Sequence, residues 1–181
     1  MKKSNNRSAA IFLDRDDTII KDAGYMSRPE QIELLPGAAE TLRSAIASGI
    51  RLYLITNQSG IGRGYYTMSD AETCNARLLE LLDLPAPGFS GICIAPEPPD
   101  VPSKYRKPSP AYLLEMLERD TLDPTRSFII GDKISDLECG QNAGITPLLV
   151  GARPEALAFA EARGIQRFAT LGEALVHACR R

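Results

Sequence analysis

Two aspartates directly follow an apolar segment near the start of the chain. The apolar residues 9–13 are succeeded by Asp14 and Asp16, separated by one arginine. Because side chains alternate along an extended chain, these two carboxylates should lie on the same side. Carboxylates that converge repel each other unless a cation neutralises them, and Mg²⁺ prefers oxygen ligands of this kind. The same pattern also occurs in solvated acidic turns, so other groups must support the metal interpretation.

A second acidic motif follows another apolar segment, residues 127–131. Asp132 comes directly after this segment, and Asp136 lies four residues later, in the expected first turn of a helix. The motif therefore places a third carboxylate at the end of a strand and a fourth close to it. Together with the first pair, these carboxylates would complete an oxygen-rich site for a metal ion.

Groups suited to binding a phosphate occur at the end of another apolar segment and before an expected helix. The apolar residues 51–56 end in Thr56 and Asn57, before the glycine-bearing sequence SGIGRG, whose backbone N–H groups are suited to cradling an anion. Arg106 and Lys107 precede a proline and the expected start of a helix, another favourable place for an anion. Each feature alone is more often an ordinary turn or a surface lysine. Four such features at strand ends are not expected by chance.

Five apolar segments rich in β-branched or aromatic residues are the expected strands, with helix-like segments between most of them. They are residues 9–13, 51–56, 89–95, 127–131 and 147–150. This alternation predicts an α/β fold, a Rossmann-like parallel sheet between two layers of helices. In such sheets ligands bind beyond the carboxyl ends of the strands, which is where the candidate residues fall.

Helix boundaries are indicated by capping residues, proline and glycine. The signals are Pro36 before and Gly49 after one segment, Ser69 with Glu72, Ser109 with Pro110, and Thr170 with Glu173. The proline-rich residues 96–108 are expected to form an ordered loop. With 181 residues and no internal repeat, the chain fits one domain spanning 1–181.

Composition and charge favour a soluble protein that acts on small molecules. The net charge is only −2 and no basic run is present, which argues against nucleic acid or a membrane surface as a partner. The four cysteines lack paired spacing, so we expect reduced thiols in the cytoplasm. The basic start, residues 1–8, precedes an apolar stretch too short for a signal peptide, and no segment is long enough to span a membrane. A cytoplasmic monomer is expected.

The motifs resemble those of the haloacid dehalogenase (HAD) superfamily of phosphatases, which use an aspartate nucleophile. The resemblance extends from Ile11 to about Val150. The segments FLDRD, GYM, LLPGA, TNQSGIGRG, RKPSP and IIGDKISD are similar to the D-glycero-D-manno-heptose-1,7-bisphosphate 7-phosphatase family. This resemblance implies a HAD-like fold without a large cap domain. It also implies removal of the C7 phosphate of that sugar, in the biosynthesis of lipopolysaccharide, capsule or nucleotide-activated heptose.

The resemblance implies a role for each matching residue. Asp14 would attack phosphorus to give an aspartyl-phosphate, and Asp16 would protonate the leaving oxygen and then activate water. Magnesium would be held by Asp14, Asp132 and the backbone carbonyl of Asp16. Thr56 and Lys107 would bind the transferred phosphoryl group.

Further residues are expected around this centre. Asn57, Arg63 and Arg106 are the candidates for holding the sugar or its second phosphate. Asp136 is expected to orient Lys133 or the metal shell rather than to bind the metal directly.

Two departures from the family pattern stand out. Asp17 occupies the place of a usual glycine, which adds negative charge and gives up backbone freedom, and we expect its side chain to point away from the site. The family also usually carries a Cys/His zinc loop before RKP, whereas residues 93–108 read CIAPEPPDVPSKYRKP. One cysteine without a histidine cannot form a tetrahedral site, so no zinc is expected and Cys93 is interpreted as a core-facing strand residue.

Other functions remain compatible with the sequence. Histidinol phosphate or another small sugar phosphate is an alternative substrate for the same chemistry. A polynucleotide phosphatase is disfavoured because no basic stripe is present. A binding protein that has lost turnover is an alternative from another class, although the retained motifs argue against it. His177, Tyr65 and Tyr66 are expected to pack or to lie at the surface, outside the site.

Overall fold

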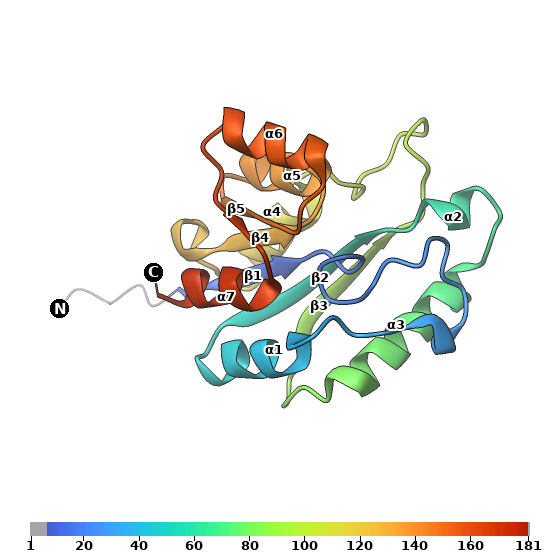
Figure 1. Cartoon of the computed structure of the whole chain (residues 1–181), viewed down its shortest axis with the longest axis horizontal. Coiled ribbons are helices and arrows are strands. Elements are labelled where there is room, and N and C mark those ends of the chain that lie inside the picture. The colour runs from blue at the N-terminus through green and yellow to red at the C-terminus, as the bar shows by residue number, and fades with distance from the viewer. Residues whose placement is uncertain (1–6, 181) are drawn as a thin grey trace.

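The central element of the fold is a parallel sheet. The computed structural model describes residues 7–180, and residues 1–6, which include most of the basic start, lie outside the described residues. Within the described range six strands pair in the order β3-β2-β1-β4-β5-β6 (Figure 1). They are β1 (Ala10–Leu13), β2 (Arg51–Asn57), β3 (Phe89–Ala95), β4 (Phe128–Gly131), β5 (Thr146–Val150) and β6 (Arg167–Phe168). The predicted α/β parallel sheet is confirmed, and β6 is the strand that the prediction missed.

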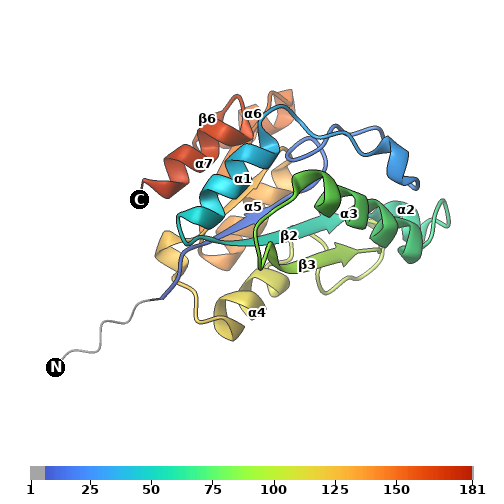
Figure 2. The same ribbon diagram turned by 90° about the horizontal axis from the view of Figure 1, so that it is seen from below.

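Helices cover both faces of this sheet, which gives the expected three layers (Figure 2). One face carries α1 (Ala38–Ala47), α3 (Met68–Leu82) and α7 (Leu171–Cys179). The other carries α4 (Ala111–Arg119), α5 (Ile134–Ala143) and α6 (Pro154–Ala162). The short helix α2 (Ser59–Gly62) follows β2, and single 3-10 turns span Pro29–Gln31 and Pro124–Arg126. In the described part of the chain, no helix has the length and apolar character needed to cross a membrane.

Strand β1 is buried on both faces. Ile11 and Leu13 pack in the core beneath α1, α3 and α7, whereas Ala10 and Phe12 pack in the core beneath α4 and α5. A strand covered on both sides needs an uninterrupted apolar sequence, which is what residues 9–13 provide. Because its side chains are held in two cores, β1 delivers the residues that follow it to a fixed place at the edge of the sheet.

The helix boundaries follow most of the expected signals. Gly49 follows the end of α1 as expected and has a left-handed φ of 79°. At the start of α7, the Thr170 hydroxyl accepts a hydrogen bond from the Glu173 backbone N–H at 3.2 Å, as expected for a cap. The prediction that Ser69 caps α3 was wrong. The helix begins at Met68, and Thr67 is its cap through reciprocal hydrogen bonds with Asp70. Both pairs fit the capping-box pattern, so the sequence pattern alone does not distinguish them.

The start of α4 differs by one residue from the expectation. The helix begins at Ala111, and the Ala111 backbone N–H lies 3.4 Å from the Ser109 hydroxyl. Differences of this size are normal at helix ends.

Candidate active site

Three carboxylates meet where β1 and β4 end. Oxygen atoms of Asp14, Asp132 and Asp136 all lie within 4.8 Å of one another. The Asp14 backbone N–H donates to the Ile130 carbonyl at 3.0 Å, which ties the two strand ends together. A Cβ atom at Gly131 would lie 2.3 Å from the Asp136 carboxyl carbon. The glycine therefore allows Asp136 to approach the sheet, and the expected convergence of carboxylates from two motifs is present.

The Lys107 ammonium lies inside this cluster. Its Nζ atom is 2.6 Å from a carboxylate oxygen of Asp14, 2.6 Å from one of Asp136 and 3.0 Å from the Ile55 carbonyl. Burial opposes the charge on Lys107, but the two carboxylates raise its pKa. Burial likewise opposes ionisation of Asp14, yet Lys107 and Lys133 hold the pKa of Asp14 below its ordinary value. Asp14 is therefore an ionised carboxylate at neutral pH, as a nucleophile requires.

Asn57 holds the Lys107 segment in place. The Asn57 side-chain oxygen accepts a hydrogen bond from the Lys107 backbone N–H, and its amide group donates to the Lys107 carbonyl, both at 3.0 Å. This pair joins the end of β2 to a loop that is 50 residues distant in sequence. The structure thus gives Asn57 a positioning role, and contact between Asn57 and a substrate stays a prediction.

The Asp16 carboxylate lies outside the cluster of three and has its own set of donors. Its Oδ1 atom accepts from Arg15 at 3.0 Å, and its Oδ2 atom accepts from Gln58 at 3.0 Å and lies 3.4 Å from the Thr56 hydroxyl. Burial raises the pKa of Asp16, opposed by Arg15 and reinforced by the negative charge of Asp14. A carboxyl group with a raised pKa is suited to carrying a proton to a leaving group. Asp14 and Asp16 are close enough for the charge of Asp14 to act on Asp16, and the expectation that their side chains lie on the same side stays a prediction.

Several supporting residues were missed from the sequence. Arg15 is 1% exposed and also donates to the Asn75 side chain at 3.0 Å, so it is fixed between Asp16 and α3. Tyr66 is buried, in agreement with the expectation that it packs, and its hydroxyl donates at 2.6 Å to Gln58, a residue that contacts Asp16. The complete burial of an arginine has no sequence signal. Gln58, in contrast, belongs to the TNQ motif and was available as a candidate.

The two arginines predicted to bind substrate lie on neighbouring loops. Arg63, at the end of α2, donates to the Tyr25 hydroxyl at 3.3 Å. Arg106 is partly buried and donates to the Glu97 carbonyl at 2.9 Å. Burial lowers the pKa of Arg106, and the positive charge of Arg63 lowers it further, so the two cations are within electrostatic reach of each other. An anion placed between them would relieve this repulsion.

The loop of residues 96–108 is held by polar contacts within itself. The Ser103 hydroxyl donates to Glu97 at 2.7 Å and accepts from the Arg106 backbone N–H at 3.1 Å. Cys93, on β3 before the loop, is 7% exposed and packs in the core beneath α4, as interpreted from the sequence. The expectation that this loop contains no zinc stays a prediction.

Asp132 is the residue best suited to a metal ion. Its Oδ1 atom is buried and has no hydrogen-bond partner among residues 7–180, and the nearest ammonium, that of Lys133, is 3.9 Å away. Burial raises the pKa of Asp132 to about 7, and the charge of Asp14 adds to this effect. A desolvated carboxylate with a free oxygen beside a second carboxylate fits a hard divalent cation such as Mg²⁺. Asp136 is less available because it is engaged by Lys107 and by the Lys133 backbone N–H.

Asp17 does not point away from the site as expected. Its φ is 55°, in the left-handed region that favours glycine. Its carboxylate pairs with Arg153, which in turn donates to Asp132. Arg153 follows β5 in sequence and was not recognised as a site residue. The side chain at the unusual position is therefore connected to the candidate metal ligand.

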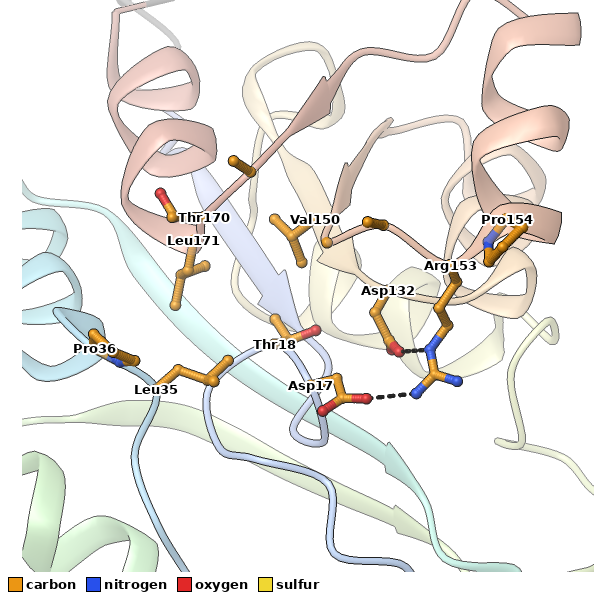
Figure 3. Close-up of a pocket in the computed structure, with 13 residues that line it drawn as sticks. Asp17, Thr18, Leu35, Pro36, Asp132, Val150, Arg153, Pro154, Thr170 and Leu171 are labelled. Atoms are coloured by element: carbon orange, nitrogen blue, oxygen red, sulfur yellow. Dashed lines mark hydrogen bonds and ion pairs between the residues drawn. The ribbon is translucent and has the colours of Figure 1, made fainter.

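A cavity of about 640 Å³ lies beside Asp17, Asp132 and Arg153. Its polar lining includes Asp17, Thr18, Asp132 and Arg153, and the rest is largely apolar (Figure 3). The residues predicted to bind substrate do not line it. The cavity therefore adjoins the cluster of three carboxylates at Asp132 and shares no residue with the predicted substrate side.

Known proteins share both the sequence and the fold. Residues 104–173 match the family model described as HAD-hydrolase-like. The D-glycero-β-D-manno-heptose-1,7-bisphosphate 7-phosphatase of Helicobacter pylori is 42% identical over 142 residues, covering 77% of this chain and 82% of the relative. The D-glycero-D-manno-heptose-1,7-bisphosphate 7-phosphatase of Chlorobaculum tepidum is 40% identical over 153 residues, covering 77% of each.

A solved structure extends the likeness to the whole fold. The D,D-heptose 1,7-bisphosphate phosphatase of B. bronchiseptica, complexed with magnesium and phosphate, superposes with a TM-score of 0.84 at 23% identity. The match covers 95% of this chain and 98% of that one. The family resemblance of the motifs is thus confirmed by sequence identity over most of the chain. The protein belongs to the D-glycero-D-manno-heptose-1,7-bisphosphate 7-phosphatase family of HAD-like hydrolases and is a phosphatase.

Proposed function

We propose that this phosphatase removes the C7 phosphate of D-glycero-D-manno-heptose 1,7-bisphosphate through an aspartyl-phosphate formed on Asp14. The observation that carries the proposal is the buried Asp14 carboxylate, held ionised by Lys107 at the end of the central strand. The names of the relatives support the substrate. The reaction would serve heptose biosynthesis for lipopolysaccharide or capsule.

The chemistry divides between two aspartates. A carboxylate oxygen of Asp14 forms a bond to phosphorus while the bond between phosphorus and the C7 oxygen breaks. Asp16, whose pKa is raised by burial, gives its proton to the departing oxygen. Asp16 then takes a proton from a water molecule, whose oxygen attacks phosphorus and releases phosphate from Asp14. Together the two steps return Asp14 and Asp16 to their starting states.

Positive charge for the transferred phosphoryl group comes from Lys107, with the Thr56 hydroxyl as a further donor. The residues that would hold magnesium are Asp14, Asp132 and the backbone carbonyl of Asp16. Bound magnesium would supply charge that offsets the repulsion between the phosphate and the carboxylates. The free oxygen of Asp132 supports this assignment.

Selection of a bisphosphate would come from Arg63 and Arg106. Their mutual repulsion makes the space between them a favourable place for the second phosphate. Binding energy from this remote group would position the reacting phosphate. Asn57 would contribute by keeping Lys107 in place.

The test measures phosphate release from both anomers of the 1,7-bisphosphate, from heptose 7-phosphate and from histidinol phosphate, with magnesium present. Phosphorus NMR of the products identifies which phosphate is lost. We expect loss of the C7 phosphate, with the highest kcat/KM for a bisphosphate. A higher kcat/KM for histidinol phosphate would show that the substrate is wrong.

The roles of the two arginines have a separate test. Arg63→Gln and Arg106→Gln should each raise KM for the bisphosphate about tenfold, the effect of one lost charge-assisted contact, and leave KM for heptose 7-phosphate nearly unchanged. Arg77→Gln on the surface of α3 serves as the matched control, since Arg77 pairs only with the exposed Glu80 within the described residues. Equal effects on both substrates would exclude selection by the second phosphate.

We further propose a cytoplasmic monomer that acts on small molecules, without nucleic-acid or membrane partners. The net charge of −2 and four free cysteines, three of them buried, support this proposal. Light scattering coupled to size-exclusion chromatography tests the monomer, and a mass of twice 19.7 kDa would contradict it.

A further inference from the structure

Arg153 connects two aspartates at the edge of the site. It lies at the start of α6, and its side chain extends to both carboxylates (Figure 3). Its Nε atom donates to Asp132, and its Nη2 atom donates to Asp17 at 2.5 Å. The same Nη2 atom is 3.8 Å from Asp22. The Arg153 guanidinium is thus hydrogen-bonded both to Asp132, the candidate metal ligand, and to Asp17.

The orientation of Asp17 is fixed from both sides. One carboxylate oxygen accepts a hydrogen bond from the Asp22 backbone N–H at 3.0 Å, and the other is held by Arg153. The left-handed φ of 55° is unfavourable for most side chains other than glycine, asparagine and aspartate. An aspartate bonded at both oxygens, one of them to the guanidinium that holds Asp132, indicates a role for its charge.

The charges explain what that role is. A guanidinium bonded directly to Asp132 orients this carboxylate but also competes with a metal cation for it. A second carboxylate bonded to the same guanidinium cancels the competing charge and leaves the orienting hydrogen bond intact. The position of Asp17 satisfies this requirement, since its carboxylate is bonded to the Nη2 atom of Arg153, beside the Nε atom that donates to Asp132.

We propose that Asp17 and Arg153 form one positioning unit for Asp132. Arg153 fixes the orientation of the Asp132 carboxylate, and Asp17 cancels the positive charge that Arg153 would otherwise bring to the metal site. The inference rests on the proposed function, because that function assigns Asp132 to magnesium.

The test is calorimetric measurement of Mg²⁺ affinity for four proteins: the wild type, Asp17→Asn, Arg153→Gln and the double variant. Asparagine keeps the size of aspartate and tolerates a left-handed φ, and its one oxygen can still accept from the Asp22 backbone N–H, so the variant removes the charge together with the acceptor that faces Arg153. We expect Asp17→Asn to weaken Mg²⁺ binding about three- to tenfold, as for other closely coupled charges. Adding Arg153→Gln to that variant should strengthen binding again, because the unbalanced cation is gone.

Two further variants separate charge from structure. The combination of Asp17→Asn with Arg153→Lys keeps the cation, so its Mg²⁺ affinity should stay low. Glu80→Gln, which removes an exposed carboxylate on α3, should bind Mg²⁺ like the wild type. A purely structural role would change the free energy of unfolding in urea and leave the Mg²⁺ affinity of the folded proteins equal.

The possible failures are distinguishable. If the wild type binds no Mg²⁺, the proposed function fails. If the wild type binds Mg²⁺ and Asp17→Asn binds it within about twofold as tightly, only the positioning unit is refuted. The positioning unit is also refuted if the double variant binds no more tightly than Asp17→Asn.

Discussion

Replacement of Lys107 by methionine removes a charge from the most buried ion pairs of the site while keeping most of the apolar stem. The lysine is 3% exposed, and its ammonium lies 2.6 Å from the carboxylates of both Asp14 and Asp136. Loss of one partner from a buried pair costs about 3–5 kcal/mol, because the remaining charge stays desolvated. We expect Lys107→Met to lower the free energy of unfolding by about 3 kcal/mol near neutral pH without magnesium.

The loss of unfolding free energy caused by Lys107→Met should increase as the pH rises. In the wild type the pKa of Asp14 lies below its unfolded value of 3.8, so its ionised form stabilises the fold above that pH. Burial already raises the pKa of Asp136 in the wild type, although Lys107 opposes this effect. Without Lys107 the pKa of Asp136 should rise further, and burial should raise that of Asp14 above its unfolded value. Ionisation then destabilises the folded variant increasingly as the pH rises through the raised pKa values. The difference between wild type and variant therefore grows from about pH 5 to about pH 8.

Urea denaturation at these two pH values, with a chelator present, provides the measurement. Lys104→Met is the matched control, since the Lys104 ammonium is also 2.6 Å from a carboxylate, that of Glu115, but the pair is exposed. We expect a much smaller change for this control because solvent screens the pair. A loss below about 1 kcal/mol for Lys107→Met, or an equal loss at both pH values, would refute the reasoning.

Three further outcomes are expected. Asp14→Asn should abolish turnover while the unfolding curve stays cooperative, and activity within about tenfold of the wild type would contradict the nucleophile. Gly131→Ala should cost about 2 kcal/mol in urea denaturation and reduce kcat, because the new Cβ would lie 2.3 Å from the Asp136 carboxyl carbon; unchanged stability would mean that Asp136 moves freely. Elemental analysis should find no stoichiometric zinc, since Cys93 is buried and the loop after it has no histidine; one zinc per chain would contradict this.

The strands predicted from the sequence include two that are buried on both faces, and also the edge strand β3, which is apolar although partly exposed. Residues 9–13 and 127–131 are uninterrupted apolar segments because helices cover both sides of β1 and β4. The edge strand β6 has two residues and only Phe168 is apolar, so no periodic signal exists. Its strand character comes from pairing with β5, which is a tertiary contact.

The same distinction applies to the site. Asp14 and Asp132 were predictable because strand ends meet at one edge of a parallel sheet, whatever the rest of the fold. The partner of Asp17 was not predictable, because Arg153 is 136 residues away and its long side chain has many possible partners. Side-chain partnership across such a distance depends on packing that no local pattern encodes.

The pKa values of the carboxylate cluster differ between Asp14, the proposed nucleophile, and Asp132, the candidate metal ligand. Lys107 contacts Asp14 and Asp136 but not Asp132, and the pKa of Asp14 is lowered while that of Asp132 is raised to about 7. Asp14 is therefore ionised before a metal binds, whereas burial disfavours the charge on Asp132, an effect that a cation would remove. It follows that the electrostatic gain on binding magnesium falls mainly on Asp132. The orientation of that carboxylate, set by Arg153, then decides how much of the gain is realised.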